Sequence, residues 1–114
     1  MRLKTALWVA AYLRRCQVEG AFAVVRRRGA EEAGAVFVRI SRLDGTSDLF
    51  GPAPQSALDT SRGADRAFTA SFAQQPASDA AVEAKLEREM KFDSDLWIVE
   101  VEDPAGQNFL DIVS

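Results

Sequence analysis

The sequence of 114 residues contains no histidine and a single cysteine, Cys16. Without an imidazole there is no Ser-His-Asp or Cys-His catalytic arrangement, no HExxH zinc helix and no histidine acid–base catalyst. One thiol without histidines also excludes the usual structural zinc sites, which take four cysteine or histidine ligands. The groups on which most hydrolases depend are therefore missing, and we expect the protein to need no cofactor.

Glycine-rich phosphate loops and long apolar runs are missing as well. The seven glycines are scattered, and none forms GxxxxGK[ST], or GxGxxG after an expected strand. The apolar run over residues 5–13 is about half of the roughly 20 residues that span a bilayer, and two arginines follow it where a signal peptide has small residues. A lone Cys16 cannot form an internal disulfide. We therefore expect a cytoplasmic protein with no membrane association.

What the chain does contain is the composition of an ordinary globular domain. Hydrophobic residues make up 47% and charged residues 27% of the chain, which is far from the low hydrophobicity and high charge of a disordered protein. A chain of this length can form one hydrophobic core. We expect a single domain over residues 1–114, with Cys16 packed inside it.

The charges are distributed unevenly. Residues 1–42 contain nine Lys and Arg against three Glu, whereas residues 43–114 contain five against fourteen Asp and Glu, for a formal net charge of −3. Such a division can mark a basic binding surface. In one folded domain the two parts must pack together, so we expect most of these charges to pair with one another.

Hydrophobic periodicity predicts two helices. One covers residues 3–19 and ends at Gly20; the other follows a Ser78 cap and buries a stripe at four-residue spacing that ends at Met90. The expected core face of the first helix consists of apolar residues at three- and four-residue steps: Leu3, Leu7, Ala10 and Leu13. That of the second consists of Val82, Leu86 and Met90.

Strand-forming residues and turn signals predict six strands: 22–28, 35–42, 46–50, 66–72, 96–102 and 108–113. The first two would form an antiparallel hairpin, and Asp44-Gly45 would turn the chain into the third. Within the fourth, alternation should turn inward Phe68, Ala70 and Phe72. Within the fifth, it should turn inward Trp97, Val99 and Val101.

The predicted order is α-β-β-β-β-α-β-β. Runs of strands joined by short turns favour an antiparallel sheet of five to six strands with helices packed on it, which is an α+β fold, over alternating parallel βαβ units. Residues 51–65 are rich in Gly, Pro, Ser, Ala and Asp. A stretch of this length without secondary structure is typical of a flexible loop.

The C-terminal carboxylates offer one catalytic hypothesis. Glu100 and Glu102 alternate onto one strand face about 7 Å apart, with Asp95 just before the strand. Paired carboxylates can hold Mg²⁺ or Mn²⁺ in a phosphodiesterase or nuclease. The Lys expected beside such a site is absent from this strand, and the alternative is a solvated outer face.

The arginines offer a second hypothesis. Arg26, Arg27 and Arg28 end one strand and Arg39 lies in its expected hairpin partner, so some of these guanidinium groups could meet phosphates on one surface. Alternation places Arg27 opposite the other two, and no aromatic residues are interleaved to stack bases. A sequence pI of about 4.9 further disfavours nucleic acid. Pairing with carboxylates of the acidic part is the favoured interpretation.

Aromatic residues on the first helix offer a third hypothesis. Trp8 and Tyr12 lie four residues apart, beside the face expected to enter the core. Core packing is the ordinary role of such residues. If their side of the helix remains exposed, it would be an interaction or dimer surface.

Three segments together are typical of one bacterial family. They are Leu13-Arg14-Arg15-Cys16, the segment Leu49-Phe50-Gly51-Pro52-Ala53-Pro54, and the run Phe92-Asp93-Ser94-Asp95-Leu96-Trp97-Ile98-Val99-Glu100-Val101-Glu102-Asp103. Over essentially its whole length, the chain resembles the small proteins grouped as domain of unknown function 1491. The resemblance brings no activity, cofactor or catalytic residue with it.

We therefore favour a non-catalytic protein-interaction or accessory domain that works with a protein partner or a second copy of itself. The alternative is the metal-dependent phosphodiesterase or nuclease. Nucleic-acid binding through the arginine-rich first hairpin comes third.

Overall fold

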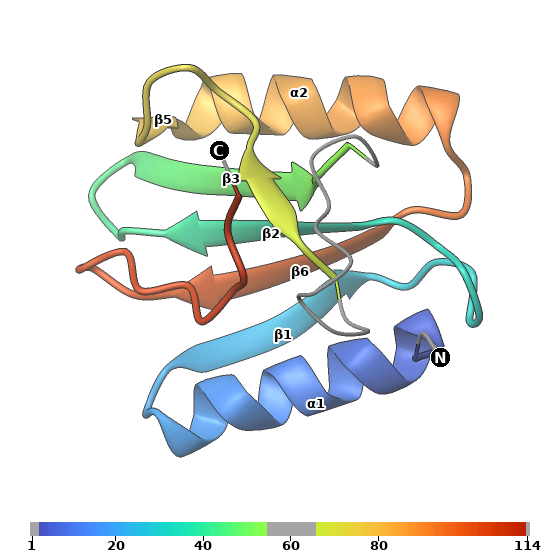
Figure 1. Ribbon diagram of the computed structural model, residues 1–114. Coiled ribbons are helices and arrows are strands. Elements are labelled where there is room, and N and C mark those ends of the chain that lie inside the picture. The colour runs from blue at the N-terminus through green and yellow to red at the C-terminus, as the bar shows by residue number, and fades with distance from the viewer. Residues whose placement is uncertain (1–2, 55–65, 114) are drawn as a thin grey trace.

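The computed structural model describes residues 3–54 and 66–113, which form two helices and a six-stranded sheet (Figure 1). The elements follow one another as α1 (Thr5–Val18), β1 (Phe22–Arg27), β2 (Val36–Ser41), β3 (Thr46–Pro52), β4 (Phe68–Ala70), β5 (Ala77–Ser78), α2 (Asp79–Phe92) and β6 (Trp97–Glu102). The α+β fold is confirmed. Of the loop expected at 51–65, the first two residues belong to β3, and positions 55–65 lie outside the described residues.

The sheet has the order β1-β6-β2-β3-β4, with β5 paired to β3. β6 pairs antiparallel with β1 and parallel with β2, so that Val99 lies between Val25 and Val38. The predicted hairpin of the first two strands is therefore wrong, and the sheet is mixed although most of its pairs are antiparallel. Four of the six residues of β6 are apolar, and its place between two strands buries side chains on both of its faces.

The glycines between β1 and β2 explain how β6 fits between them. A Cβ atom on Gly29 would lie 2.0 Å, and one on Gly34 2.4 Å, from the carbonyl oxygen of Asp95. The backbone N–H of Ala30 donates to that same oxygen at 2.9 Å. Residues 29–34 therefore cross close to the start of β6 and do not form a hairpin turn.

The hairpin of β2 and β3 is confirmed, with Ser41 opposite Ser47. Positive φ falls on Leu43 (63°) and Gly45 (90°), with Asp44 between them. The Asp44 carboxylate accepts hydrogen bonds from the backbone N–H and the hydroxyl of Thr46, at 3.0 and 2.6 Å. The turn thus has the expected position. Its positive φ values fall on Leu43 and Gly45, however, and not on the adjacent pair Asp44-Gly45, as a type I′ turn would require.

The two helices cover opposite faces of the sheet, and each face has its own core. The side chains of Trp97, Val99 and Val101 enter the core beneath α1, as predicted. Ile98 and Leu96 enter the core beneath α2. The face of β6 that was expected to be solvated is therefore partly covered by a helix.

Within α1 the buried face differs from the predicted one, and of the four predicted core residues only Leu13 packs, partly buried, against the core. The residues that α1 buries are Thr5, Val9, Tyr12 and Cys16. Leu3 and Leu7 are instead 42% and 57% exposed. The helix is apolar around most of its circumference, so hydrogen bonds decide its orientation: the Thr5 hydroxyl donates to the Gly34 carbonyl at 2.9 Å, and the Tyr12 hydroxyl to that of Asn108 at 2.6 Å.

Within α2 the prediction largely holds. Ser78 caps the helix by accepting a hydrogen bond from the Ala81 N–H at 3.2 Å. Val82 and Leu86 are fully buried, and Met90 is partly buried against the same core.

The fourth and sixth predicted strands are shorter than expected. Of the three inward candidates in the fourth strand, Phe68 is buried, Phe72 is partly buried against the core beneath α2, and Ala70, at the end of β4, is exposed. The strand predicted at 108–113 is reduced to one parallel bridge, between Phe68 and Ile112. A positive φ of 58° at Phe109 interrupts the extended backbone there. The chain therefore has one strand after α2, where two were predicted.

Candidate functional sites

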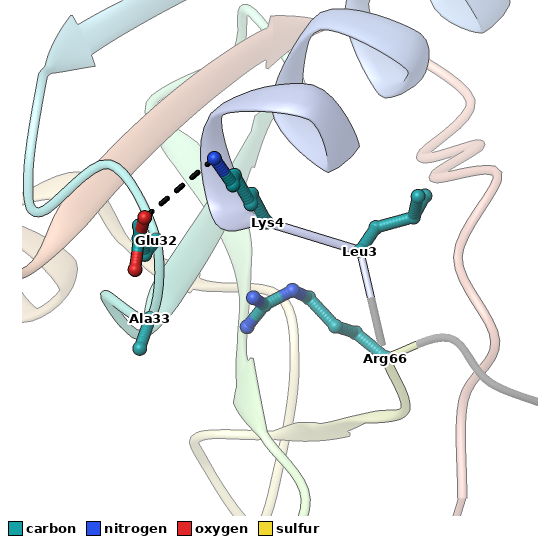
Figure 2. A pocket seen from close by; sticks show the side chains of 5 residues that line it. All are labelled: Leu3, Lys4, Glu32, Ala33 and Arg66. Atoms are coloured by element: carbon teal, nitrogen blue, oxygen red, sulfur yellow. Dashed lines mark ion pairs between the residues drawn. The ribbon is translucent and has the colours of Figure 1, made fainter. Parts of the chain in front are cut away.

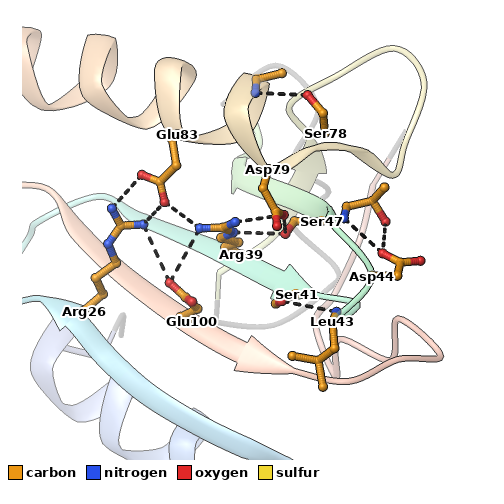
Figure 3. Close-up of polar contacts among 12 residues, drawn as sticks. Arg26, Arg39, Ser41, Leu43, Asp44, Ser47, Ser78, Asp79, Glu83 and Glu100 are labelled. Atoms are coloured by element: carbon orange, nitrogen blue, oxygen red, sulfur yellow. Dashed lines mark hydrogen bonds and ion pairs between the residues drawn. The ribbon is translucent and has the colours of Figure 1, made fainter.

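A network of charged side chains joins α2 to the sheet, with Arg39 of β2 at its centre (Figure 3). Arg39 is only 7% exposed. Its guanidinium lies 2.9 Å from Asp79 and 2.5 Å from Glu83, both on α2, and its Nε donates to the Ser47 hydroxyl at 3.0 Å. Each nitrogen of the buried cation thus has an acceptor, as burial of a charge requires.

Arg26 of β1 completes the network. Its two terminal nitrogens donate to the two oxygens of Glu83, each at 2.6 Å, and one of them lies 3.6 Å from Glu100. Glu100 also lies 3.9 Å from Arg39. Strands β1, β2 and β6 are thereby connected to a single turn of α2.

Contacts in this network stabilise the ionised forms of Glu83, Asp79 and Arg26. The hydrogen bond from Arg26 lowers the pKa of Glu83, and the Ser47 hydroxyl lowers that of Asp79. The hydrogen bond between Arg26 and Glu83 also raises the pKa of the Arg26 guanidinium. A general acid or base needs a pKa near neutrality, so these shifts fit ion pairing.

The other predicted arginines do not join this group. Arg27 donates to the backbone carbonyls of Leu96 and Ser94, the latter at 3.1 Å. The guanidinium of Arg28, expected beside Arg26, lies 4.9 Å from the centre of the Trp97 ring, because β1 ends at Arg27. Internal pairing of Arg26 and Arg39 with carboxylates is confirmed. The four arginines do not form one exposed basic patch.

The three carboxylates of the metal hypothesis are also dispersed. Asp95 precedes β6 and Glu102 ends it, so an extended strand separates them by roughly 20 Å. Glu100 lies between them and contacts Arg26 and Arg39. Across residues 3–54 and 66–113, no three Cys, Asp or Glu side chains lie close enough to hold a metal ion.

A shallow pocket of about 300 Å³ lies at the start of α1 (Figure 2). It is lined by Leu3, Lys4, Glu32, Ala33 and Arg66. The Lys4 ammonium lies 3.5 Å from Glu32, and Arg66 donates to the Thr5 hydroxyl at 2.6 Å. This volume is at the lower limit for ligand sites, and both cations of the lining already contact protein groups.

The two groups of α1 that could be reactive are both buried. Cys16 is 0% and Tyr12 5% exposed. Burial raises the pKa of the Cys16 thiol and that of the Tyr12 phenol. Because a nucleophilic cysteine needs an accessible thiolate, Cys16 acts as a packing residue, as expected.

The predicted aromatic surface on α1 is not exposed as proposed. Trp8 is half-buried and stacks on Tyr12, with ring centroids 5.1 Å apart, and it also contacts Phe68. Both aromatic residues belong to the core beneath α1. Exposure was the argument for a binding role of this pair, and for Tyr12 that argument fails.

The exposed apolar residues of α1 lie on the opposite side of the helix. We call this side the outer face of α1; its members are Leu7, Ala10, Ala11, Arg14 and Val18, and Leu3 is exposed just before the helix begins at Thr5. Val18 is 74% exposed. The sequence contained a signal for this orientation, because Thr5, Val9, Tyr12 and Cys16 recur at the same helical spacing as the leucines.

Comparison with known proteins identifies the family. The model of the family described as "Protein of unknown function (DUF1491)" matches residues 3–111. The chain belongs to the DUF1491 family. The comparison with curated proteins finds no match.

Two DUF1491-like structures, both from bacteria, have the same fold. A crystal structure of a DUF1491 family protein from Caulobacter crescentus is 36% identical, with a TM-score of 0.79 and full coverage of both chains. A solution structure of an A. tumefaciens protein is 43% identical, with a TM-score of 0.81, and the match covers 98% of this chain and 95% of that one. The family description assigns no function.

The ion-pair network of this DUF1491 domain makes its stability depend on pH in the acidic range. The pKa of Glu83 is lower in the folded protein than its ordinary value of 4.5, so the stabilisation is complete above that value and is lost as the pH falls through the folded pKa. In urea titrations, the difference in free energy of unfolding between the wild type and Glu83→Gln should be largest near pH 7 and shrink towards pH 3. A constant difference over this range would show that ionised Glu83 contributes nothing.

Proposed function

We propose that this DUF1491 domain is a non-catalytic interaction module that binds a protein partner through the outer face of α1. The observation that carries the proposal is the exposure of Leu7 and Val18 on one side of α1, with Leu3 exposed just before the helix, while the other side fills the core. Contiguous exposed apolar side chains on a small protein mark interaction surfaces. We also propose a cytoplasmic location, since its one cysteine is buried and unpaired.

The internal use of charged groups supports an interaction role over a catalytic one. Arg39, Arg26 and Glu83 contact one another, and Glu100 lies against both arginines. Chemistry at phosphate needs carboxylates or cations that are free to meet the substrate. We find no such free group that favours either the phosphodiesterase or nucleic-acid binding among the described residues, and both functions stay alternatives.

No helix among the described residues is long and apolar enough to cross a membrane. A protein surface is the occupant that we propose for the exposed apolar side chains of α1.

Site-specific photo-cross-linking in the cells that naturally contain the protein tests this function. A benzophenone amino acid in place of Leu7 should capture a discrete partner, because Leu7 is 57% exposed and belongs to the proposed surface. The matched control carries the same group in place of Phe92, which is 89% exposed at the end of α2. Equal capture from the two positions, or none from position 7, would contradict the proposal.

A further inference from the structure

We infer that the partner contributes an amphipathic helix with acidic flanks, which packs lengthwise on the outer face of α1. This inference rests on the proposed function and names the chemistry of the partner. Three observations carry it: the spacing of the exposed side chains, the small residues among them and the charge of the surface.

The spacing fits helix–helix packing. Leu7, Ala10, Ala11 and Arg14 occupy positions i, i+3, i+4 and i+7, which form the four corners of a hole that receives one side chain of a facing helix. Val18 extends the surface one turn beyond Arg14, and Leu3 is exposed just before the helix begins at Thr5. The 14-residue helix is about 21 Å long, so it can accept three to four turns of a partner.

The small residues deepen that hole. Ala10 and Ala11 are both exposed and lie between the larger side chains of Leu7 and Arg14. Two neighbouring alanines leave space above the helix, so a leucine of the partner can enter between the flanking side chains. A partner strand could not form backbone hydrogen bonds with the middle of α1, because the N–H and C=O groups there already bond within the helix.

The charge of the surface selects the flanks of the partner. Arg14 stands within the outer face, and within the part of the chain that the structure describes it forms no ion pair. Lys4 and Arg15 lie beside the outer face. Lys4 contacts Glu32 at 3.5 Å and Arg15 contacts Glu19 at 3.4 Å, and all four side chains are exposed. Exposed pairs of this kind are weak, so a carboxylate of the partner facing Arg14 adds attraction and orientation.

The same charges disfavour a second copy of this chain. Two α1 helices packed face to face would bring two sets of Lys4, Arg14 and Arg15 together, and Glu19 and Glu32 of each chain would offset only part of that charge. Juxtaposed like charges suppress wrong partners. The structure therefore points to a heterologous partner.

Two synthetic peptides test the inference. Both are helical, about 18 residues long, with the same leucine seam; one has Glu and the other Lys at the flanking positions. By fluorescence anisotropy at low salt, the acidic peptide should bind at least about tenfold more tightly than the basic one. Amide resonances of ¹⁵N-labelled protein should shift on addition of the acidic peptide, with the largest shifts at Leu3, Leu7, Ala10 and Arg14.

Substitutions with matched controls locate the contact. Leu7→Asp should weaken binding of the acidic peptide about tenfold or more, and Arg14→Glu should reverse the preference in favour of the basic peptide. Phe92→Asp introduces the same charge at another exposed apolar position and should leave the affinity unchanged. All three positions are exposed, and far-UV circular dichroism with a thermal scan verifies that each variant is folded.

Four results would overturn the inference: equal affinities for the two peptides, the largest shifts outside α1, a dimer that Leu7→Asp dissociates, or tighter binding to anionic phosphatidylglycerol vesicles than to the acidic peptide. Its failure is separable from that of the proposed function. If cross-linking from position 7 captures a partner while neither peptide binds, the interaction function stands and the chemistry inferred here for the partner is wrong.

Discussion

Replacement of Trp97 by Ala should lower the free energy of unfolding by about 3 to 5 kcal/mol. Trp97 has the largest of the fully buried side chains, with 1% exposure, and lies at the start of the interior strand β6. Its Nε1 donates to the Ala30 carbonyl at 2.7 Å, and the Arg28 guanidinium covers the ring. The substitution therefore leaves a cavity and also removes the contact that fixes the crossing between β1 and β2.

Urea unfolding followed by far-UV circular dichroism at pH 7 measures this loss. Trp97→Phe keeps most of the apolar volume and loses the N–H donor and part of the ring system, so its cost should be smaller, about 1 to 3 kcal/mol. Phe92→Ala removes an aromatic ring of which 89% is exposed, and its effect should stay within about 0.5 kcal/mol. If Trp97→Ala costs less than about 1 kcal/mol, the ring does not support the core as described.

The second large effect concerns Arg39, whose replacement by Met should cost about 2 to 3 kcal/mol. Removing one partner of a fully buried ion pair costs about 3 to 5 kcal/mol, since the other charge remains buried without compensation. Here the side chains of Glu83 and Glu100 are 35% and 28% exposed, so water reduces the penalty. Met keeps much of the aliphatic contact of Arg39, so the change reports mainly on the charge.

A double-mutant cycle separates the ion pair from packing. Arg39→Met and Glu83→Gln should each be destabilising, and the double variant should lose about 1 kcal/mol less than the sum of the two, because the side chains share one interaction. Strict additivity of the two losses would mean that the 2.5 Å contact between Arg39 and Glu83 contributes nothing to stability.

Local patterns predicted the elements well, and pairing between distant elements poorly. The Ser78 cap, the β2–β3 hairpin and the inward alternation of Trp97 all follow from neighbouring residues. The insertion of β6 between β1 and β2 depends on a contact between Gly29 and Asp95, which are far apart in the sequence. The pattern bounded by Gly29 and Gly34 fits a turn as well as a close crossing, so periodicity could not distinguish them.

The candidate surface was missed for a related reason. An α-helix that is apolar on several sides allows more than one orientation, and the larger side chains of Leu3 and Leu7 favoured the wrong one. The decisive interactions involve Thr5 and Tyr12, whose hydroxyls bond to carbonyls of Gly34 and Asn108. The uneven charge distribution predicted that Arg26 and Arg39 pair with carboxylates of the acidic part. Which carboxylates these are could be learned only from the fold.

The position of β6 also imposes an order on folding during synthesis. β1 and β2 are made early, yet β1 must wait for β6, which begins only at Trp97, while β2 has β3 as a hairpin partner in the meantime. Pairing over such a sequence separation is slow, and unpaired strands are exposed to aggregation in the meantime. A nascent chain stalled before residue 97 should therefore stay protease-sensitive throughout, with no stable N-terminal fragment, and depend on chaperones until its last strand is available.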